Sequence, residues 1–191
     1  MHALDKVVAE DHRVNALEVS IDNECSQLIA RRQPTAGDLR MVLAVIKIVT
    51  DLERVGDEAA KIARMGKMSY GRARMPSMPI AAVKHVGDIA LGMLRKALDA
   101  FARLDTAAAA SIVREDFAID EEFRAIVRQL ITFMMEDPRT ISASLDTLWV
   151  AKAIERIGDH AKNIAEYVVY VVEGKDIRHT DYATVKQQEA H

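Results

Sequence analysis

The feature that most constrains the fold is a short segment that occurs twice. Glu53–Asp57 (ERVGD) returns 102 residues later as Glu155–Asp159 (ERIGD). The match continues past both copies, through Ala59/Ala161, Ile62/Ile164 and Ala63/Ala165. Internal repetition of this kind indicates that the chain is built from two copies of one structural unit.

A second pair of matching stretches precedes the ERxGD segments. Apolar residues recur in each at heptad-like spacing, which is typical of long packed helices. The stretches superpose with an offset of 105 residues, and Asp11 then aligns with Asp116. The two seams are Leu4, Val7, Asp11, Val14, Glu18, Ile21, Cys25 and Leu28, and Ala109, Ile112, Asp116, Ile119, Phe123, Ile126, Leu130 and Phe133.

Turn and capping residues divide the chain into helices. Asp105 is an expected N-cap, Gly174 an expected helix stop, and Thr35 with Asp38 an expected capping pair. The helix that precedes the second unit has no counterpart before the first, so the first unit is one helix short. The predicted helices span residues 2–32, 36–69, 80–104, 106–136 and 140–173.

The expected fold is therefore all-α, with two tandem helical repeats. We assign a truncated first repeat of two helices to 1–74, a linker to 75–79, a second repeat of three helices to 80–174 and a polar tail to 175–191. Half of the residues are hydrophobic and only 5% are aromatic, with 4 Pro and 8 Gly, which favours helices over a β-sandwich.

Charge and hydropathy restrict the function. A net charge of −3 argues against nucleic acid as a partner, and no run of about 18 apolar residues is present to span a membrane. We expect no signal peptide, because no basic region precedes an apolar stretch at the start. The single cysteine, Cys25, excludes an internal disulfide and fits a small buried side chain in a reducing cytoplasm.

Carboxylates lie on the apolar seams of the matching helices. A carboxylate at a helix interface is unfavourable unless it is paired or binds a cation. Mid-helix Gly56 and Gly158 each cost about 1 kcal/mol relative to Ala, which suggests the close approach of a neighbouring helix or of something bound between helices. The candidate ligands are Asp11, Glu53 and Asp57 in the first unit and Asp116, Asp120, Glu155 and Asp159 in the second.

The second set of acids should meet at one level. Asp116 and Asp120 lie about as far before the turn at Pro138 as Glu155 and Asp159 lie after it, so antiparallel helices would bring them level within roughly 3 Å. Such an oxygen-rich site suits Mg²⁺, Mn²⁺, Ca²⁺, iron or Zn²⁺.

The alternative to metal binding is neutralisation of these acids by basic side chains in ion pairs. The candidates for that role are Arg54, Arg156, Lys61 and Lys162. His160 could be a ligand, but a solvated or hydrogen-bonded histidine is the favoured interpretation, and Trp149 belongs either to the core or to an interface.

The sequence contains no phosphate-binding glycine loop, no nucleophile–base pair and no zinc pattern, so we do not expect an enzyme. An alternative from another class is a ferritin-like dinuclear metal oxidoreductase. Those bundles use Glu-x-x-His, which occurs nowhere here. A metal-free helical scaffold is a third hypothesis.

The paired ERxGD helices resemble the PhoU family of regulators of bacterial phosphate uptake. Further similar stretches are Ile29–Thr35, Ala100–Arg103, Ile126–Leu130 and Met134–Asp137, so the resemblance covers nearly the whole chain. It implies a PhoU-like fold of two three-helix-bundle repeats, with metal ions (Mg, Mn, Fe or Zn) held by the E/D-x-x-x-D motifs.

The resemblance also implies a function and partners. The expected protein is a negative regulator of phosphate-starvation signalling that joins the ATPase subunit of a phosphate ABC transporter to a membrane sensor histidine kinase. It would be cytoplasmic, or peripheral at the inner membrane through these partners.

Two departures from the family pattern matter. The usual first helix is absent, which indicates a shortened form and predicts an apolar groove on the first unit that a homodimer would cover. Asn15 supplies an amide where a carboxylate is expected, so the first metal site should be the weaker one.

Overall fold

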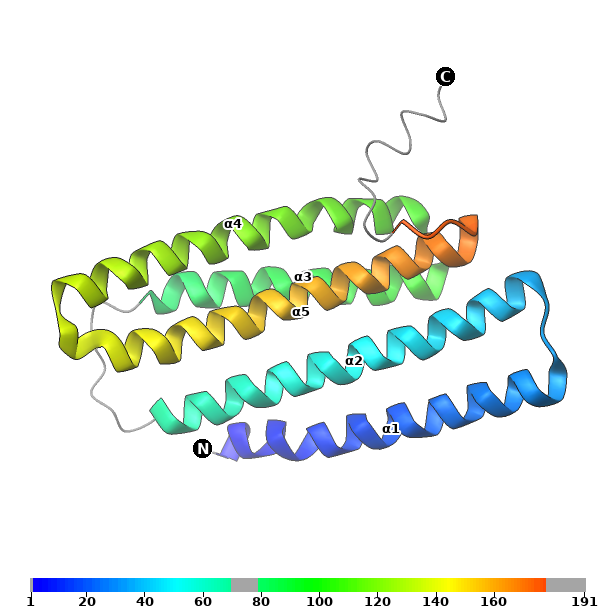
Figure 1. Cartoon of the computed structure of the whole chain (residues 1–191), viewed down its shortest axis with the longest axis horizontal. Helices are drawn as coiled ribbons and strands as arrows, with labels where there is room; N and C mark the ends of the chain where they lie inside the picture. The colour runs from blue at the N-terminus through cyan, green and yellow to red at the C-terminus, as the bar shows by residue number, and fades with distance from the viewer. Residues whose placement is uncertain (1, 70–78, 178–191) are drawn as a thin grey trace, which may run out of the picture.

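In the computed structural model, which describes residues 2–69 and 79–177, the chain forms five long α-helices (Figure 1). The helices are α1 (His2–Arg32), α2 (Ala36–Ser69), α3 (Ile80–Arg103), α4 (Thr106–Glu136) and α5 (Ile141–Glu173), with a 3-10 turn η1 (Pro138–Thr140) before α5. The predicted all-α fold is confirmed. Of the other sequence predictions, residues 75–78 of the linker and 178–191 of the tail lie outside the described residues.

The helices form a bundle with an additional pair on one side. α3, α4 and α5 pack against one another, α2 packs along α5, and α1 packs along α2 at the edge of the molecule (Figure 1). The main hydrophobic core lies within the three-helix bundle and extends to Ala44 and Ile48 of α2. α5 is therefore the central helix, in contact with α2, α3 and α4.

Capping residues end the helices at the expected places. The Asp105 carboxylate accepts a hydrogen bond from the Ala108 N–H at 2.9 Å and begins α4. Gly174 adopts a φ of 73°, the left-handed conformation that glycine reaches without strain, and its N–H donates to the Tyr170 carbonyl. Two boundaries differ by one residue: α3 ends at Arg103, with Leu104 as its left-handed C-cap, and α5 begins at Ile141, because Thr140 belongs to the 3-10 turn.

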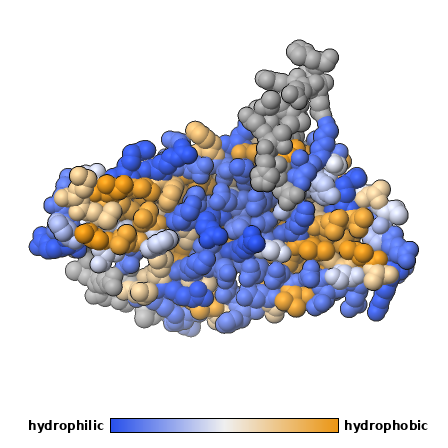
Figure 2. Space-filling view, viewed as in Figure 1, coloured by the Kyte–Doolittle hydropathy of each residue, from blue (hydrophilic) through white to orange (hydrophobic). Residues whose placement is uncertain are grey.

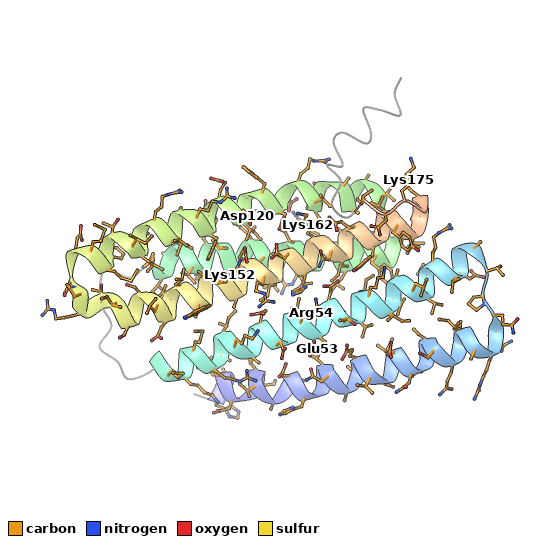
Figure 3. The ribbon with its side chains drawn as sticks, viewed as in Figure 1. Glu53, Arg54, Asp120, Lys152, Lys162 and Lys175 are labelled. Atoms are coloured by element: carbon orange, nitrogen blue, oxygen red, sulfur yellow. The ribbon has the colours of Figure 1, made fainter. Side chains whose placement is uncertain are left out.

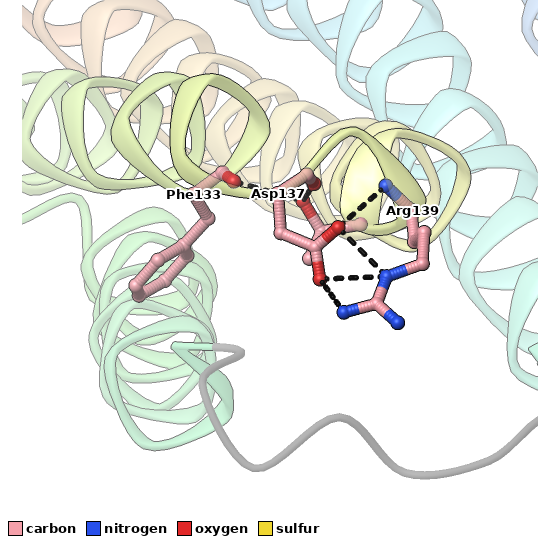
Figure 4. A network of polar contacts seen from close by, with 4 residues as sticks. Phe133, Asp137 and Arg139 are labelled. Carbon is pink, nitrogen blue, oxygen red and sulfur yellow. Dashed lines mark hydrogen bonds and ion pairs between the residues drawn. The ribbon is translucent and has the colours of Figure 1, made fainter.

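The turn between α4 and α5 is held by one aspartate (Figure 4). Asp137 donates its N–H to the Phe133 carbonyl, and its carboxylate accepts hydrogen bonds from the backbone N–H and the guanidinium of Arg139. These bonds to Arg139 lower the pKa of Asp137. The turn fixes α4 and α5 as antiparallel neighbours, which the predicted alignment of their acids requires.

Candidate functional site

The first acidic cluster lies between α1 and α2. Asp11 is buried on α1, and its Oδ2 lies 3.8 Å from the Arg64 guanidinium of α2. Asp11 Oδ1 and Asn15 Oδ1 are also buried, and neither accepts a hydrogen bond from the described residues. Buried oxygens without donors are unfavourable, so this cluster has unused capacity to bind a cation or a donor.

The pKa of Glu53 is raised, and the causes of this shift show which charged groups lie near it. Desolvation raises its pKa most, and the carboxylates of Asp57, Glu18 and Asp11 raise it further, against the opposing charge of Arg54. The structure therefore brings together the predicted residues Asp11, Glu53 and Asp57. It adds Glu18, to which the Thr50 hydroxyl donates a hydrogen bond at 3.4 Å.

The second acidic cluster lies between α4 and α5, and lysines hold two of its carboxylates. Lys162 donates to Asp116 Oδ2 at 2.8 Å, and Lys152 donates to Glu155 Oε1 at 2.6 Å. The Lys152 ammonium also lies 5.3 Å from the centre of the Phe123 ring. Glu155 Oε2 is buried and accepts no hydrogen bond from the part of the chain that the structure describes.

Within this cluster, the clearest shift in pKa is that of Asp159. Desolvation, followed by the charges of Glu155 and Asp116 and finally of Asp120, raises its pKa to about 6, and only Lys152 opposes them. All four acids of the second unit therefore lie close enough to interact. The predicted common level of these residues, to within roughly 3 Å, stays a prediction.

The two mid-helix glycines both face a neighbouring helix, at different distances. A Cβ on Gly56 would lie 3.4 Å from Asp11 Oδ1, and a Cβ on Gly158 would lie 2.7 Å from Ile119 Cδ1. Gly158 thus lets α4 and α5 approach closely beside Asp116, whereas the contact at Gly56 is an ordinary van der Waals distance. Close helix packing therefore accounts for Gly158 and not for Gly56.

The donor chemistry of both clusters fits a hard divalent cation, since each combines carboxylates with a buried, unpartnered oxygen. Within residues 2–69 and 79–177, however, no three acidic, histidine or cysteine side chains converge as a metal site would require. Lys152 and Lys162 occupy carboxylate oxygens instead, and both would have to turn away for a metal to bind. The metal ligands therefore remain a prediction.

Some expected ion pairs form elsewhere. Lys162 neutralises a cluster acid as anticipated, but Lys61 and Arg156 pair with Glu58, at 2.8 and 3.0 Å. Glu58 is buried between α2 and α5. Of these two ion pairs, Arg156–Glu58 joins α5 to α2 and so connects the two repeats, whereas Lys61–Glu58 lies within α2.

A second polar contact joins the repeats. His160 Nδ1 of α5 lies 2.7 Å from Asp51 Oδ1 of α2, and the Asn163 amide donates to the same oxygen at 3.2 Å. His160 and Asp51 are both buried. The prediction of a solvated or hydrogen-bonded His160 is therefore confirmed in its hydrogen-bonded form.

Several charged residues in and beside the two clusters lie in one zone of the molecule. Glu53 and Arg54 on α2 and Asp120, Lys152 and Lys162 on α4 and α5 lie near the middle of the long axis (Figure 3). In the same view a hydrophilic band crosses the middle of the molecule between two apolar zones (Figure 2). Both acidic clusters therefore belong to the central zone.

The site residues that the sequence reasoning missed are Glu18, Arg64 and Lys152. Glu18 follows Asp11 by seven residues on one helix seam, which could have placed it in the cluster. Lys152 precedes Glu155 by three residues, a spacing that puts both side chains on one face.

The fold and its paired acidic clusters define a helical protein of two repeats. The chain belongs to the PhoU family: the PhoU domain matches residues 2–65 and again 83–168. Members of this family are non-enzymatic regulatory accessory proteins, in agreement with the predicted lack of enzymatic activity.

Individual relatives support this assignment. A Burkholderia phosphate-specific transport system accessory protein PhoU homolog is 51% identical over 97% of this chain and 80% of its own length. The Escherichia coli K12 phosphate-specific transport system accessory protein PhoU is 45% identical, over 91% of this chain and 71% of its own length.

Solved structures show the same fold. PhoU from Pseudomonas aeruginosa superposes with a TM-score of 0.87 at 44% identity, covering 90% of this chain and 82% of that one. The phosphate transport system regulatory protein PhoU from Streptococcus pneumoniae gives 0.82 at 28% identity, covering 91% and 80%. None of the helices in the described ranges is long and apolar enough to cross a bilayer.

Proposed function

We propose that this protein regulates phosphate transport, as a metal-binding negative regulator that joins a phosphate ABC transporter to a sensor histidine kinase. The family assignment supports the transport role, because its relatives are described as phosphate-specific transport accessory proteins. The observation that carries the metal-binding part is the pair of acidic clusters with buried, unpartnered oxygens at Asp11 and Glu155.

The proposed ligands are the predicted carboxylates together with Glu18. A bound divalent cation would supply positive charge that relieves the repulsion that raises the pKa of Asp159 and Glu53. Asp116 and Glu155 would exchange their lysine partners for the metal. Asn15 supplies a neutral oxygen to the first cluster, so we expect weaker binding there.

Calorimetric titration with Mg²⁺, Mn²⁺, Fe²⁺ and Zn²⁺ tests the metal sites. Glu155→Ala/Asp159→Ala should remove the tighter of two binding events, and Glu53→Ala/Asp57→Ala should remove the weaker one. Circular dichroism checks that each variant remains helical. Absence of heat with every metal, or isotherms identical to the wild type in both variants, would refute the metal-binding role.

Gene deletion tests the regulatory role separately. Loss of the protein in the parent bacterium should switch on phosphate-starvation genes in high phosphate, and a second deletion of the sensor kinase should abolish that induction. Genes that stay silent, or induction that persists without the kinase, would contradict the proposal. The assigned location is the cytoplasm, with attachment to the inner membrane through these partners.

The edge position of α1 supports association of two copies. An open cleft of about 330 Å³ lies along α1 and α2 and is largely apolar. It is lined by Ala3, Lys6, Val7, Glu10, Asp11, Val14, Gly56 and Ala59. A homodimer that covers this cleft should show twice the chain mass in light scattering, and a monomer at high concentration would count against it.

A further inference from the structure

A groove between the two repeats adjoins both acidic clusters, because Arg64 and Lys152 line it and also contact Asp11 and Glu155. It runs between the C-terminal half of α2 and the N-terminal half of α5 and has a volume of about 350 Å³. Both repeats contribute to it. Its lining residues are Glu58, Lys61, Arg64, Met65, Trp149, Lys152, Ala153 and Arg156.

The charged side chains that line the groove are mostly cationic, although the whole chain carries a net charge of −3. Four of its lining side chains are cationic and only Glu58 is acidic. The cationic side chains are 46%, 52%, 43% and 50% exposed for Lys61, Arg64, Lys152 and Arg156. Lys has three donors and Arg five, so each of these groups retains donors beyond its present ion pair.

Buried Glu58 positions two of these cations. Its Oε1 lies 2.8 Å from Lys61 Nζ and 3.0 Å from an Arg156 guanidinium nitrogen, so one carboxylate holds a base from each repeat. Side chains braced in this way lose less conformational entropy when a ligand binds. The basic groove is therefore partly preorganised.

An apolar strip continues from the groove toward the α4–α5 turn. Ile141, Leu145 and Trp149 follow at four-residue intervals on one face of α5, and all three are exposed. Ile131 and Met135 near the end of α4 are exposed as well. Apolar side chains gather at the end of the molecule where α4 meets α5 (Figure 2).

We propose that this groove and strip dock an acidic amphipathic helix from a partner protein. Its apolar side chains would lie on the strip around Trp149, and its carboxylates would pair with Lys61, Arg64 and Arg156. An apolar face laid into a groove is an established mode of helix recognition. The proposal rests on the proposed function, in which the protein acts by binding other proteins, and it specifies the chemistry of one such interface.

Trp149 is the only tryptophan in the chain, so its fluorescence reports directly on the groove. The probe is a synthetic helical peptide with Leu on one face and Glu on the other, and the control peptide carries Lys in place of each Glu. The acidic peptide should shift Trp149 emission saturably, and the basic peptide should not. Equal responses to both peptides, or no response to either, would overturn the proposal.

Matched variants locate the binding. Lys61→Gln/Arg64→Gln should weaken binding of the acidic peptide about tenfold at low salt, and Leu145→Asp should weaken it as well. Lys84→Gln/Arg95→Gln removes the same charge from exposed positions on α3 and should leave the affinity within about twofold. Equal weakening by both double variants would refute the groove as the binding site.

A lipid ligand and the cellular role of the groove are tested in two further experiments. Vesicles containing phosphatidylglycerol test the lipid ligand, and a Trp149 response to vesicles but not to the acidic peptide would overturn the proposal. In cells, Lys61→Glu/Arg64→Glu should induce phosphate-starvation genes while Lys84→Glu/Arg95→Glu should not. If gene deletion induces these genes but the groove variant does not, the docking proposal fails and the regulatory function stands.

Discussion

The two repeats carry the same acidic motif in different surroundings. In the second, α5 packs against three helices, and sixteen of its residues are buried. In the first, α1 packs along α2, and its buried residues are Asp11 and Cys25. The acids of the second repeat therefore lie on helices of the three-helix core, while those of the first lie on a pair of helices at the edge of the molecule. Equivalent substitutions in the two repeats should therefore have unequal effects on stability.

Core truncation should show the largest difference. Ile164 is fully buried in α5, whereas its repeat counterpart Ile62 is partly buried. Ile164→Ala should lower the free energy of unfolding by about 3 kcal/mol and Ile62→Ala by about 1 kcal/mol, because a cavity forms only where the surroundings are closed. Urea unfolding measures both values. Equal losses would show that the repeats are equally packed.

The paired glycines should respond with opposite sign. Alanine gains about 1 kcal/mol of helix propensity over glycine, but overpacking a closed interface costs about 1–3 kcal/mol. Gly158→Ala meets Ile119 and should destabilise the protein, whereas Gly56→Ala has ordinary contact distances and should be neutral or stabilising. Thermal unfolding of both variants decides this, and stabilisation by both would contradict the tight approach of α4 to α5.

The acidic clusters predict a specific pH dependence. Because the pKa of Asp159 is raised to about 6 from an ordinary 3.8, the folded state holds this proton more tightly than the unfolded state does. The contribution is fully present below about pH 4 and is lost as the pH rises through about 6. Asp159→Asn should therefore stabilise the metal-free protein at pH 7 and have little effect below pH 4.

Asp57→Asn is the matched change in the first repeat. It leaves Asp159 and its neighbours in place, so stability should still fall between about pH 4 and 6 as Asp159 ionises. Thermal melts across this range compare both variants with the wild type. If the stability of Asp159→Asn fell with rising pH as steeply as that of the wild type, the pH dependence would belong to another group.

The smallest effect is expected at Glu18. Its charge contributes to the raised pKa of Glu53, but desolvation is the larger cause. Glu18→Gln should lower that pKa while leaving it above its ordinary value. Carboxyl-carbon NMR titration measures the shift, with Glu10→Gln as a control on the same helix. A Glu53 titration unchanged by Glu18→Gln would remove Glu18 from the first cluster.

Much of this architecture could be predicted from the sequence. Asp105 and Gly174 mark helix ends, and the repeated ERxGD segments, together with the turn at Pro138, predict that the acids of α4 and α5 lie near one another. The contacts between repeats could not be predicted. Asp51 and His160 are 109 residues apart, and their pairing depends on how α2 packs on α5, which no periodicity along one helix specifies. The sequence does not predict that Trp149 is exposed, because its place on the helix fits either the core or an interface.

Lys152 and Arg64 each line the groove and each contact an acidic cluster, through Glu155 and Asp11 respectively. When either side chain turns toward a carboxylate in the groove, the acid that it leaves regains its full charge and its attraction for a cation. By thermodynamic reciprocity, a cation bound at that acid releases the basic side chain to the groove with the same free energy. If the groove binds an acidic helix and the clusters bind a cation, as we propose, the two binding events would be coupled through these two side chains.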